Sequence, residues 1–416
     1  MSTQEGIDYA GRAKAELGFS RWWQVAAAAV MMGLVSPYQY VWSSIEGPLS
    51  QALGIEQAAI GLVFTLFVIF QAGSQVPVGW WRDRHGPRRL TLLAGVLAGG
   101  GYLGLAVASS VWQLYLFYSL GAIGVGIVYT VAVNTALKWF PDRRGLTTGV
   151  GTMAFAGGSA LIVPYVRANA TVGGYADVLT NMGLLIGVGI LVGAVVLTDP
   201  PTDWLDDAHA EANESQREML NEKQYTSSEM LRTWQFWLMY GMFIAVSGAG
   251  LMLTAKIVSF AQHLELTAFI ATASATVLPI AGGIGRLVLG EISDRVDRER
   301  AMFASFSLCG LGLLAVVYFG VSGMQYAFVG AVVVATFFWS PQYTLFPSVV
   351  GDYYGREHSS ANYAFLYSGK MWGGLFGGAV TGFLVSALSW ETTFMLGGVL
   401  AITAGVASLL LSSPRD

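Results

Sequence analysis

Long apolar runs separated by short polar breaks dominate the pattern of this chain. The runs are roughly 20 residues long, the length that an α-helix needs to cross the hydrocarbon core of a bilayer. They fall at residues 22–45, 58–80, 90–109, 112–137, 146–167, 177–198, 235–258, 267–291, 301–321, 324–349, 361–386 and 390–411. The pattern predicts an all-α integral membrane protein with twelve transmembrane helices.

One long polar interval, residues 199–232, divides the twelve runs into two sets of six. It opens with Asp199-Pro200-Pro201 and is rich in acidic residues. We expect a solvated acidic connector between an N-terminal half, residues 1–198, and a C-terminal half, residues 233–416. Residues 1–21 are polar and precede a full-length span, so we do not expect a cleaved signal peptide.

Basic residues lie on one side of the predicted membrane. They follow spans 2, 4 and 8, whereas the breaks after spans 3, 9 and 11 contain no Lys or Arg. Because cytoplasmic loops carry the excess of Lys and Arg, this asymmetry predicts that the basic loops, the connector and both termini are cytoplasmic. We therefore expect the protein to lie in the cell membrane, with the lipid bilayer as its partner.

Composition agrees with a membrane protein. Hydrophobic residues make up 54% of the chain and charged residues only 12%, about half the charged share of a soluble domain. The 52 glycines suit close helix contacts in lipid. The single cysteine, Cys309, excludes an intramolecular disulfide.

Two cations lie inside apolar runs without a nearby acid. Arg286 lies in the run 267–291, and Lys370 lies about nine residues into the run 361–386. A cation at the centre of a bilayer costs roughly 2.5–3.5 kcal/mol on insertion scales, and such residues are usually functional. No Asp or Glu falls in spans 1–11 away from their ends. We therefore predict that an anionic substrate supplies the missing charge, and we take the lack of a buried carboxylate to disfavour a proton relay.

Plainer interpretations of these and other cations stay open. Lys370 could pair with a carboxylate that the sequence pattern does not reveal, and Arg286 could snorkel toward the cytoplasm from its place near Gly290. Lys256 and Arg167 lie near the outer ends of their spans. We expect each of them to snorkel to the interface or to line a funnel that attracts anions.

Several other patterns give no sign of a different function. The glycine clusters 121–126 and 373–378 lack the strand that precedes a nucleotide-binding fingerprint, so we assign them to helix packing. His85, His209, His263 and His358 are too scattered for a metal site. We expect no catalytic residue, no metal, no cofactor and no nucleic-acid partner, and we expect a monomer.

The two sets of spans also repeat a loop. The sequence after span 2 runs from Gly79 to Arg89 and contains Asp83 and Arg84. The sequence after span 8 contains Gly290, Asp294 and Arg295 at matching places. A duplicated half with matched loops is typical of alternating-access carriers.

This loop resembles the signature of the major facilitator superfamily. The resemblance implies the fold of that superfamily, with twelve helices in two six-helix halves, and implies that Gly79, Asp83, Arg84, Gly290, Asp294 and Arg295 form gate elements. Loop charge that only sets topology is the alternative. Further segments are similar to the oxalate:formate antiporter family: Gln71-Ala72-Gly73-Ser74-Gln75, Gly124 to Tyr129, Asn134-Thr135, Trp139 to Asp142, and Tyr343 to Ser348.

The family resemblance implies a binding chamber. In that family an Arg of helix 8 and a Lys of helix 11 bind carboxylate, and Arg286 and Lys370 match these positions. The walls of the chamber match at Gln39, Tyr40, Tyr129, Trp339 and Tyr343. Two positions depart from the family pattern: Phe155 replaces an expected Tyr, and Tyr367, also a wall, replaces an expected Trp.

We therefore predict a secondary transporter that exchanges small carboxylates by alternating access, of the oxalate/formate antiport type. Two cations suit a dianion, and the doubly charged site should resist closing unless an anion is bound. A proton-coupled monocarboxylate carrier is the nearer alternative. An integral-membrane enzyme lacks a nucleophile and base at membrane depth, and a sensor would be expected to carry an added soluble domain.

Overall fold

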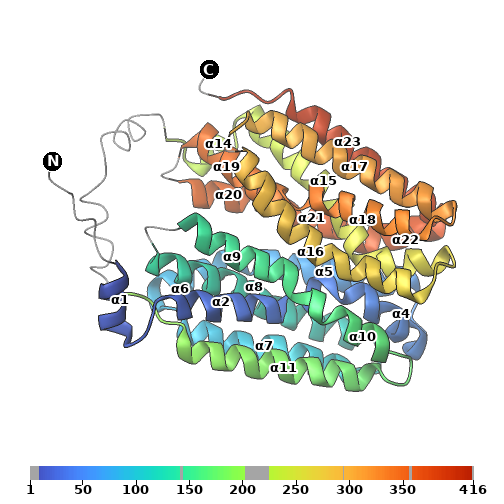
Figure 1. The fold of residues 1–416 in the computed structure, drawn as a ribbon, viewed down its shortest axis with the longest axis horizontal. Coiled ribbons are helices and arrows are strands. Elements are labelled where there is room, and N and C mark those ends of the chain that lie inside the picture. Colours follow the sequence, from blue (N-terminus) through green and yellow to red (C-terminus); the bar gives the residue numbers. More distant parts are fainter. Residues whose placement is uncertain (1–8, 141–143, 202–223, 294, 356–357, 415–416) are drawn as a thin grey trace.

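The protein is described by a computed structural model that covers residues 9–140, 144–201, 224–293, 295–355 and 358–414. Every regular element in these ranges is a helix. Figure 1 shows two helix groups side by side, the first from α2 to α11 and the second from α15 to α23. Both ends of the described chain lie at the left of the figure, which we call the terminal side, and the opposite end is the far side.

The first group contains helices that precede residue 200. Their bounds are α1 Tyr9–Leu17, α2 Trp22–Val35, α3 Pro37–Tyr40, α4 Trp42–Leu53, α5 Gln57–Gly73, α6 Gln75–His85, α7 Arg88–Ala106, α8 Val111–Trp139, α9 Arg144–Gly157, η1 Gly158–Leu161, α10 Val163–Asn169 and α11 Tyr175–Val196.

The second group contains helices that follow residue 226. Their bounds are α14 Ser227–Met230, α15 Trp234–His263, α16 Ala268–Ser293, α17 Arg298–Val321, α18 Gln325–Trp339, α19 Gln342–Tyr354, α20 Ser359–Tyr367, α21 Gly369–Leu375, η3 Phe376–Val380, α22 Thr381–Ala387 and α23 Trp390–Ser408. The boundaries predicted for the halves and for the connector stay a prediction, and most of the connector lies outside the described residues.

Among the described residues, ten helical stretches are long and apolar enough to cross a bilayer. The pair Trp22–Tyr40 and Trp42–Leu53, bent by 48°, makes an eleventh. The predicted run 361–386 forms α20, α21, the π-helical η3 and α22 in succession instead of one unbroken helix. The helical, multi-span architecture is therefore confirmed, whereas the count of twelve is not.

The first span ends later than predicted. The chain bends at Val41, and α4 then continues through Pro48 to Leu53, where Gly54 adopts the left-handed conformation (φ 64°) that ends the helix. Glu46 therefore lies inside the bent span and is buried. The prediction that the spans hold no carboxylate away from their ends is wrong for this reason.

Glycines allow the helices to approach closely, as predicted for both glycine clusters. A Cβ on Gly124 would lie 2.6 Å from the Ala98 nitrogen, and one on Gly377 would lie 2.8 Å from the Leu251 backbone. Real Cβ atoms do not approach other atoms this closely, so a side chain at either position would force the helices apart. These clusters serve helix packing.

The two groups touch near the far side. Thr65 of α5 donates its hydroxyl proton to the Gly374 carbonyl (3.1 Å) and accepts from the Ala379 amide (2.9 Å). Beside it, a Cβ on Gly61 would lie 2.8 Å from the Gly378 carbonyl oxygen. The far ends of α5 and of the α21–α22 segment are thus in backbone contact, with no space between them.

The duplicated loop after α6 turns at Gly86, whose φ of 72° favours glycine. Arg82 is buried and pairs with Asp199 (2.7 Å), which also binds Lys138 (3.1 Å). Asp199, predicted to open the connector, thereby ties α6 and α8 to the end of α11.

The predicted gate residues are only partly described. Arg84 is exposed, and Arg295 is exposed and pairs with Glu291 (2.5 Å). A Cβ added to Gly79 or Gly290 would make only ordinary van der Waals contact, at 4.0 and 3.9 Å. The Asp83 side chain and Asp294 lie outside the described residues. The gate role stays a prediction.

Candidate substrate-binding site

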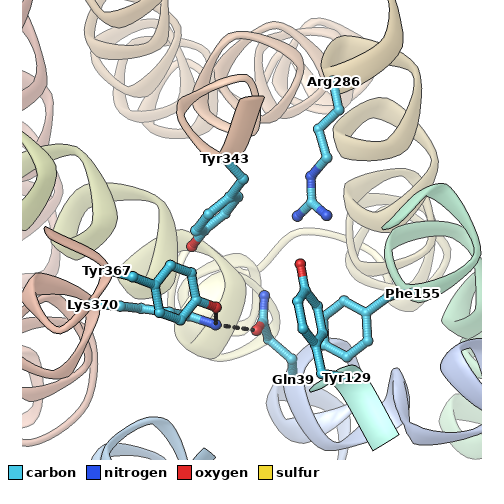
Figure 2. A pocket seen from close by; sticks show the side chains of 7 residues that line it. All are labelled: Gln39, Tyr129, Phe155, Arg286, Tyr343, Tyr367 and Lys370. Carbon is cyan, nitrogen blue, oxygen red and sulfur yellow. Dashed lines mark hydrogen bonds between the residues drawn. The ribbon is translucent and has the colours of Figure 1, made fainter. Parts of the chain in front are cut away.

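A small cavity lies between the two helix groups and is lined by Gln39, Tyr129, Phe155, Arg286, Tyr343, Tyr367 and Lys370 (Figure 2). Its side chains pack closely, with almost no room between them for a water molecule. The first group supplies three of these side chains, from α3, α8 and α9, and the second supplies four, from α16, α19, α20 and α21. Neither group forms the cavity alone.

Lys370 reaches the cavity from α21 and is buried. Its Nζ donates to Gln39 Oε1 (3.3 Å), Gln71 Oε1 (3.0 Å) and the Tyr367 hydroxyl (3.3 Å). All three acceptors are neutral oxygens. They orient the ammonium group and leave its positive charge uncompensated.

Arg286 enters the cavity from α16, and Figure 2 shows its guanidinium beside Tyr343 and pointing toward the Tyr129 hydroxyl. Its Nε donates to the Ser340 hydroxyl (2.6 Å) and its Nη1 to the Thr152 main-chain carbonyl (3.3 Å). A guanidinium carries five N–H donors, so these two bonds leave three donors for another acceptor. At 4% exposure the side chain does not snorkel.

The Tyr343 ring faces both cations. Its centroid lies 4.9 Å from Arg286 Cζ and 5.6 Å from Lys370 Nζ, and Lys370 lies equally far from the Tyr367 ring. Within about 6 Å, an aromatic face attracts a cation. The Tyr343 hydroxyl is buried and makes no hydrogen bond within the described residues. It is therefore a free donor beside two positive charges.

Neither cation has a carboxylate partner in the part of the chain that the structure describes. Two positive charges that share one cavity raise each other's free energy, because none of the described lining residues carries a negative charge and water is largely excluded. An anion that enters the cavity removes this cost and gains charge-assisted hydrogen bonds. The arrangement is suited to bind a small anion.

Two residues that were predicted to form walls of the chamber, Tyr40 and Trp339, lie behind the residues that line the cavity. Tyr40 is fully buried and packs its ring 6.2 Å from Phe155. Trp339 packs edge-on to Tyr343 at 5.8 Å, and it fits only because position 250 is glycine, where a Cβ would lie 2.1 Å from the indole nitrogen. Both side chains support lining residues and do not line the cavity themselves.

The two departures from the family pattern are both in the lining. Phe155 packs edge-on to Tyr129 at 5.3 Å and offers no hydroxyl to the cavity. The Tyr367 hydroxyl oxygen accepts a hydrogen bond from Lys370 Nζ, which an indole could not do because its nitrogen only donates.

Sequence reasoning missed two site residues. Gln71 holds Lys370, and Ser340 holds Arg286. Neutral polar residues inside an apolar run give no charge signal. Gln71 lies in one of the segments that resemble the oxalate:formate antiporter family, which was a weak signal. Ser340 precedes Pro341 at the break between α18 and α19, which was another.

The structure corrects the prediction for Lys256. The prediction that it snorkels or lines a funnel is wrong, because it is fully buried and its Nζ binds Glu46 Oε1 at 2.5 Å. Helix α15 runs on to His263 instead of ending near 258, which places Lys256 two turns inside the span. Arg167 is half-buried and donates to the Thr272 hydroxyl (3.3 Å), so its funnel role stays a prediction.

Within the described ranges, no group of three or more His, Cys, Asp or Glu could hold a metal ion. The cavity itself contains no carboxylate, thiol or imidazole among its lining residues. The lining residues offer hydrogen-bonding groups and two positive charges.

Comparison with known proteins identifies the family of the chain. The profile of the Major Facilitator Superfamily matches residues 25–365. The chain belongs to the major facilitator superfamily. The protein is thus a transporter of that superfamily and not an enzyme, as predicted.

Among individual proteins, the chain is 31% identical over 391 residues to the oxalate:formate antiporter of Oxalobacter formigenes, with 94% of this chain and 90% of that protein covered. It is 24% identical to the probable sulfoacetate transporter SauU of Cupriavidus necator, covering 89% of each chain. Among solved structures, the D-xylose-proton symporter matches with a TM-score of 0.73 at 13% identity, covering 95% of this chain and 99% of that one. This structural likeness supports the fold.

Proposed function

We propose that this protein is a secondary transporter that exchanges small carboxylate anions, of the oxalate/formate antiport type, with Arg286 and Lys370 as the anion clamp. The observation that carries the proposal is the pair of buried cations that share one cavity and have only neutral oxygen partners within the described residues. The similarity to an oxalate:formate antiporter supports the same substrate class.

The clamp would use its two cations differently. The Arg286 guanidinium offers a planar fork that suits a carboxylate, whereas Lys370 offers a point charge. A small dicarboxylate would neutralise both charges, and the Tyr343 hydroxyl is free to donate a further hydrogen bond. A monoanion would neutralise one charge and leave the other. Dianions should therefore bind more tightly than monoanions.

Exchange follows from the position of the clamp between the two helix groups. Both cations belong to the second group, and three of their acceptors, Gln39, Gln71 and the Thr152 carbonyl, belong to the first. We infer that the groups are the two halves that rock about the site. A site with two uncompensated charges would close poorly, so an anion would have to be bound on each crossing. The terminal side would face the cytoplasm because the basic loops lie there.

The test is counterflow of labelled oxalate in proteoliposomes, competed by mono- and dicarboxylates. Lys370→Gln should reduce oxalate exchange to background while the protein keeps its melting temperature. Arg300→Gln, which removes an exposed cation that pairs locally with Asp297 on the terminal side, is the control and should retain exchange. Normal exchange by Lys370→Gln would refute the assignment.

A proton-coupled monocarboxylate carrier is the rival function. The buried carboxylate Glu46 removes the sequence argument against proton coupling. The rival predicts uptake of formate or lactate that is driven by a pH gradient into vesicles without internal anion. Antiport predicts no such uptake, and oxalate efflux that depends on external anion.

A further inference from the structure

A second buried charge pair joins the two helix groups outside the cavity. Lys256 Nζ of α15 lies 2.5 Å from Glu46 Oε1 of α4, and the side chains are 0% and 1% exposed. The two residues are 210 positions apart in sequence. Neither residue lines the cavity. The pair therefore needs an explanation of its own.

Both residues lie at the same depth. Each is seven residues before the last residue of its helix, Leu53 for Glu46 and His263 for Lys256. At 1.5 Å per residue this places the pair roughly 10 Å inside the far end of the bundle. The pair is thus on the side where Thr65 and Gly61 meet the α21–α22 segment.

An ion pair at this depth is sensitive to separation of the groups. Two opposite charges that are buried together satisfy each other, but a buried charge without its partner is strongly unfavourable. If the far side opens, the two helices part and each charge needs water. The pair can therefore exist in only two favourable forms, which are closed and dry, or separated and hydrated.

We propose that Glu46 and Lys256 form a latch that holds the helix groups together on the far side and breaks whenever that side opens. The latch sets the balance between the two conformations of the carrier without touching the substrate. The inference rests on the alternating access proposed above, but it does not depend on which anion is carried.

The latch predicts that single variants destabilise the closed form and that the double variant does not. Removing one charge leaves the other buried in the closed form, so that form loses stability relative to the open form, where water solvates the remaining charge. Removing both charges leaves no ion to hydrate and should restore the balance, because neutral replacements of a buried ion pair are often tolerated. A residue that only stabilises the fold gives no such recovery.

The experiment measures access to the far side with a thiol reporter. Ser43→Cys, in a Cys309→Ala background, places the reporter on α4 one turn before Glu46, where the native side chain is 1% exposed. Its rate of reaction with a membrane-impermeant maleimide is measured in vesicles of each orientation, without substrate. Adding Glu46→Gln or Lys256→Met should raise the rate at least tenfold on the far side.

The double variant Glu46→Gln/Lys256→Met should label within threefold of the parent, as should the charge-swapped Glu46→Lys/Lys256→Glu. Single variants that label at the parental rate, or a double variant that labels as fast as the singles, would overturn the latch. If a single variant does not fold, Glu46→Asp takes its place and should also label faster; an unchanged rate overturns the latch. Because labelling requires no substrate, a failed latch is distinguishable from a wrong substrate assignment, which the exchange assay reports.

Discussion

Lys370 Nζ donates a hydrogen bond of 3.0 Å to Gln71 Oε1, and the two residues belong to different helix groups. The neutral amide oxygen orients the ammonium group without cancelling its charge. This difference between an amide and a carboxylate decides whether the cavity can take up an anion, because a resident carboxylate would occupy Lys370 permanently.

Replacing the amide by an acid tests this relationship. Gln71→Glu should form an ion pair with Lys370 and lower the apparent affinity for oxalate by tenfold or more, since hydrogen bonds to charged groups are worth about 1.5–3 kcal/mol. Initial rates of labelled oxalate exchange at several concentrations give the affinity. Gln71→Met removes the acceptor without adding charge and should lose less than about fivefold. Equal losses in the two variants would contradict a charge effect.

Ser340 is expected to position Arg286. Ser340→Ala removes the acceptor of Nε, and an unsatisfied buried donor costs about 1–3 kcal/mol, so the guanidinium should turn away and oxalate affinity should fall about fivefold or more. Ser305→Ala is the matched control, because it removes an equally buried hydroxyl that donates to the Phe338 carbonyl (2.7 Å) away from the cavity. The control should lower the melting temperature and spare affinity. Loss of affinity in both variants would assign Ser340 a merely structural role.

Gly378→Ala should hinder closing of the far side. The added Cβ would lie 2.3 Å from the Thr65 hydroxyl and 2.6 Å from the Gly61 carbonyl oxygen, so the two helix groups could not meet there. We expect exchange to slow at least tenfold. Gly330→Ala is the control, since its added Cβ would meet no atom of a neighbouring helix within 4 Å, and the better helix propensity of alanine should leave stability unchanged or raised. An unaltered exchange rate in Gly378→Ala would show that this contact does not limit the cycle.

The sequence pattern predicted the helical spans and the two cations of the cavity because both depend on local composition. Apolar runs of bilayer length identify helices without knowledge of their partners. Arg286 and Lys370 stand out because a charge in such a run is unusual. The structure brings these two residues to one cavity, as the family resemblance implied.

The missed features depend on chain geometry that composition does not encode. The bend at Val41 and the extension of α4 to Leu53 bring Glu46 into the span, and the extension of α15 to His263 buries Lys256. Errors of a few residues at two helix ends therefore concealed an entire ion pair. Gln71 was missed because an uncharged side chain in an apolar helix gives no signal until its neighbour across the interface is known.

The hydrogen bond from Arg286 Nη1 to residue 152 affects which amino acids this position can hold among relatives of the protein. Its acceptor is the main-chain carbonyl of residue 152, and every amino acid supplies such an oxygen. The threonine at that position can therefore be exchanged during evolution while the arginine keeps this tether. Neither a comparison of relatives nor alanine scanning would detect this bond, because both change only side chains. Chemical replacement of the peptide linkage by an ester would show how much transport depends on it.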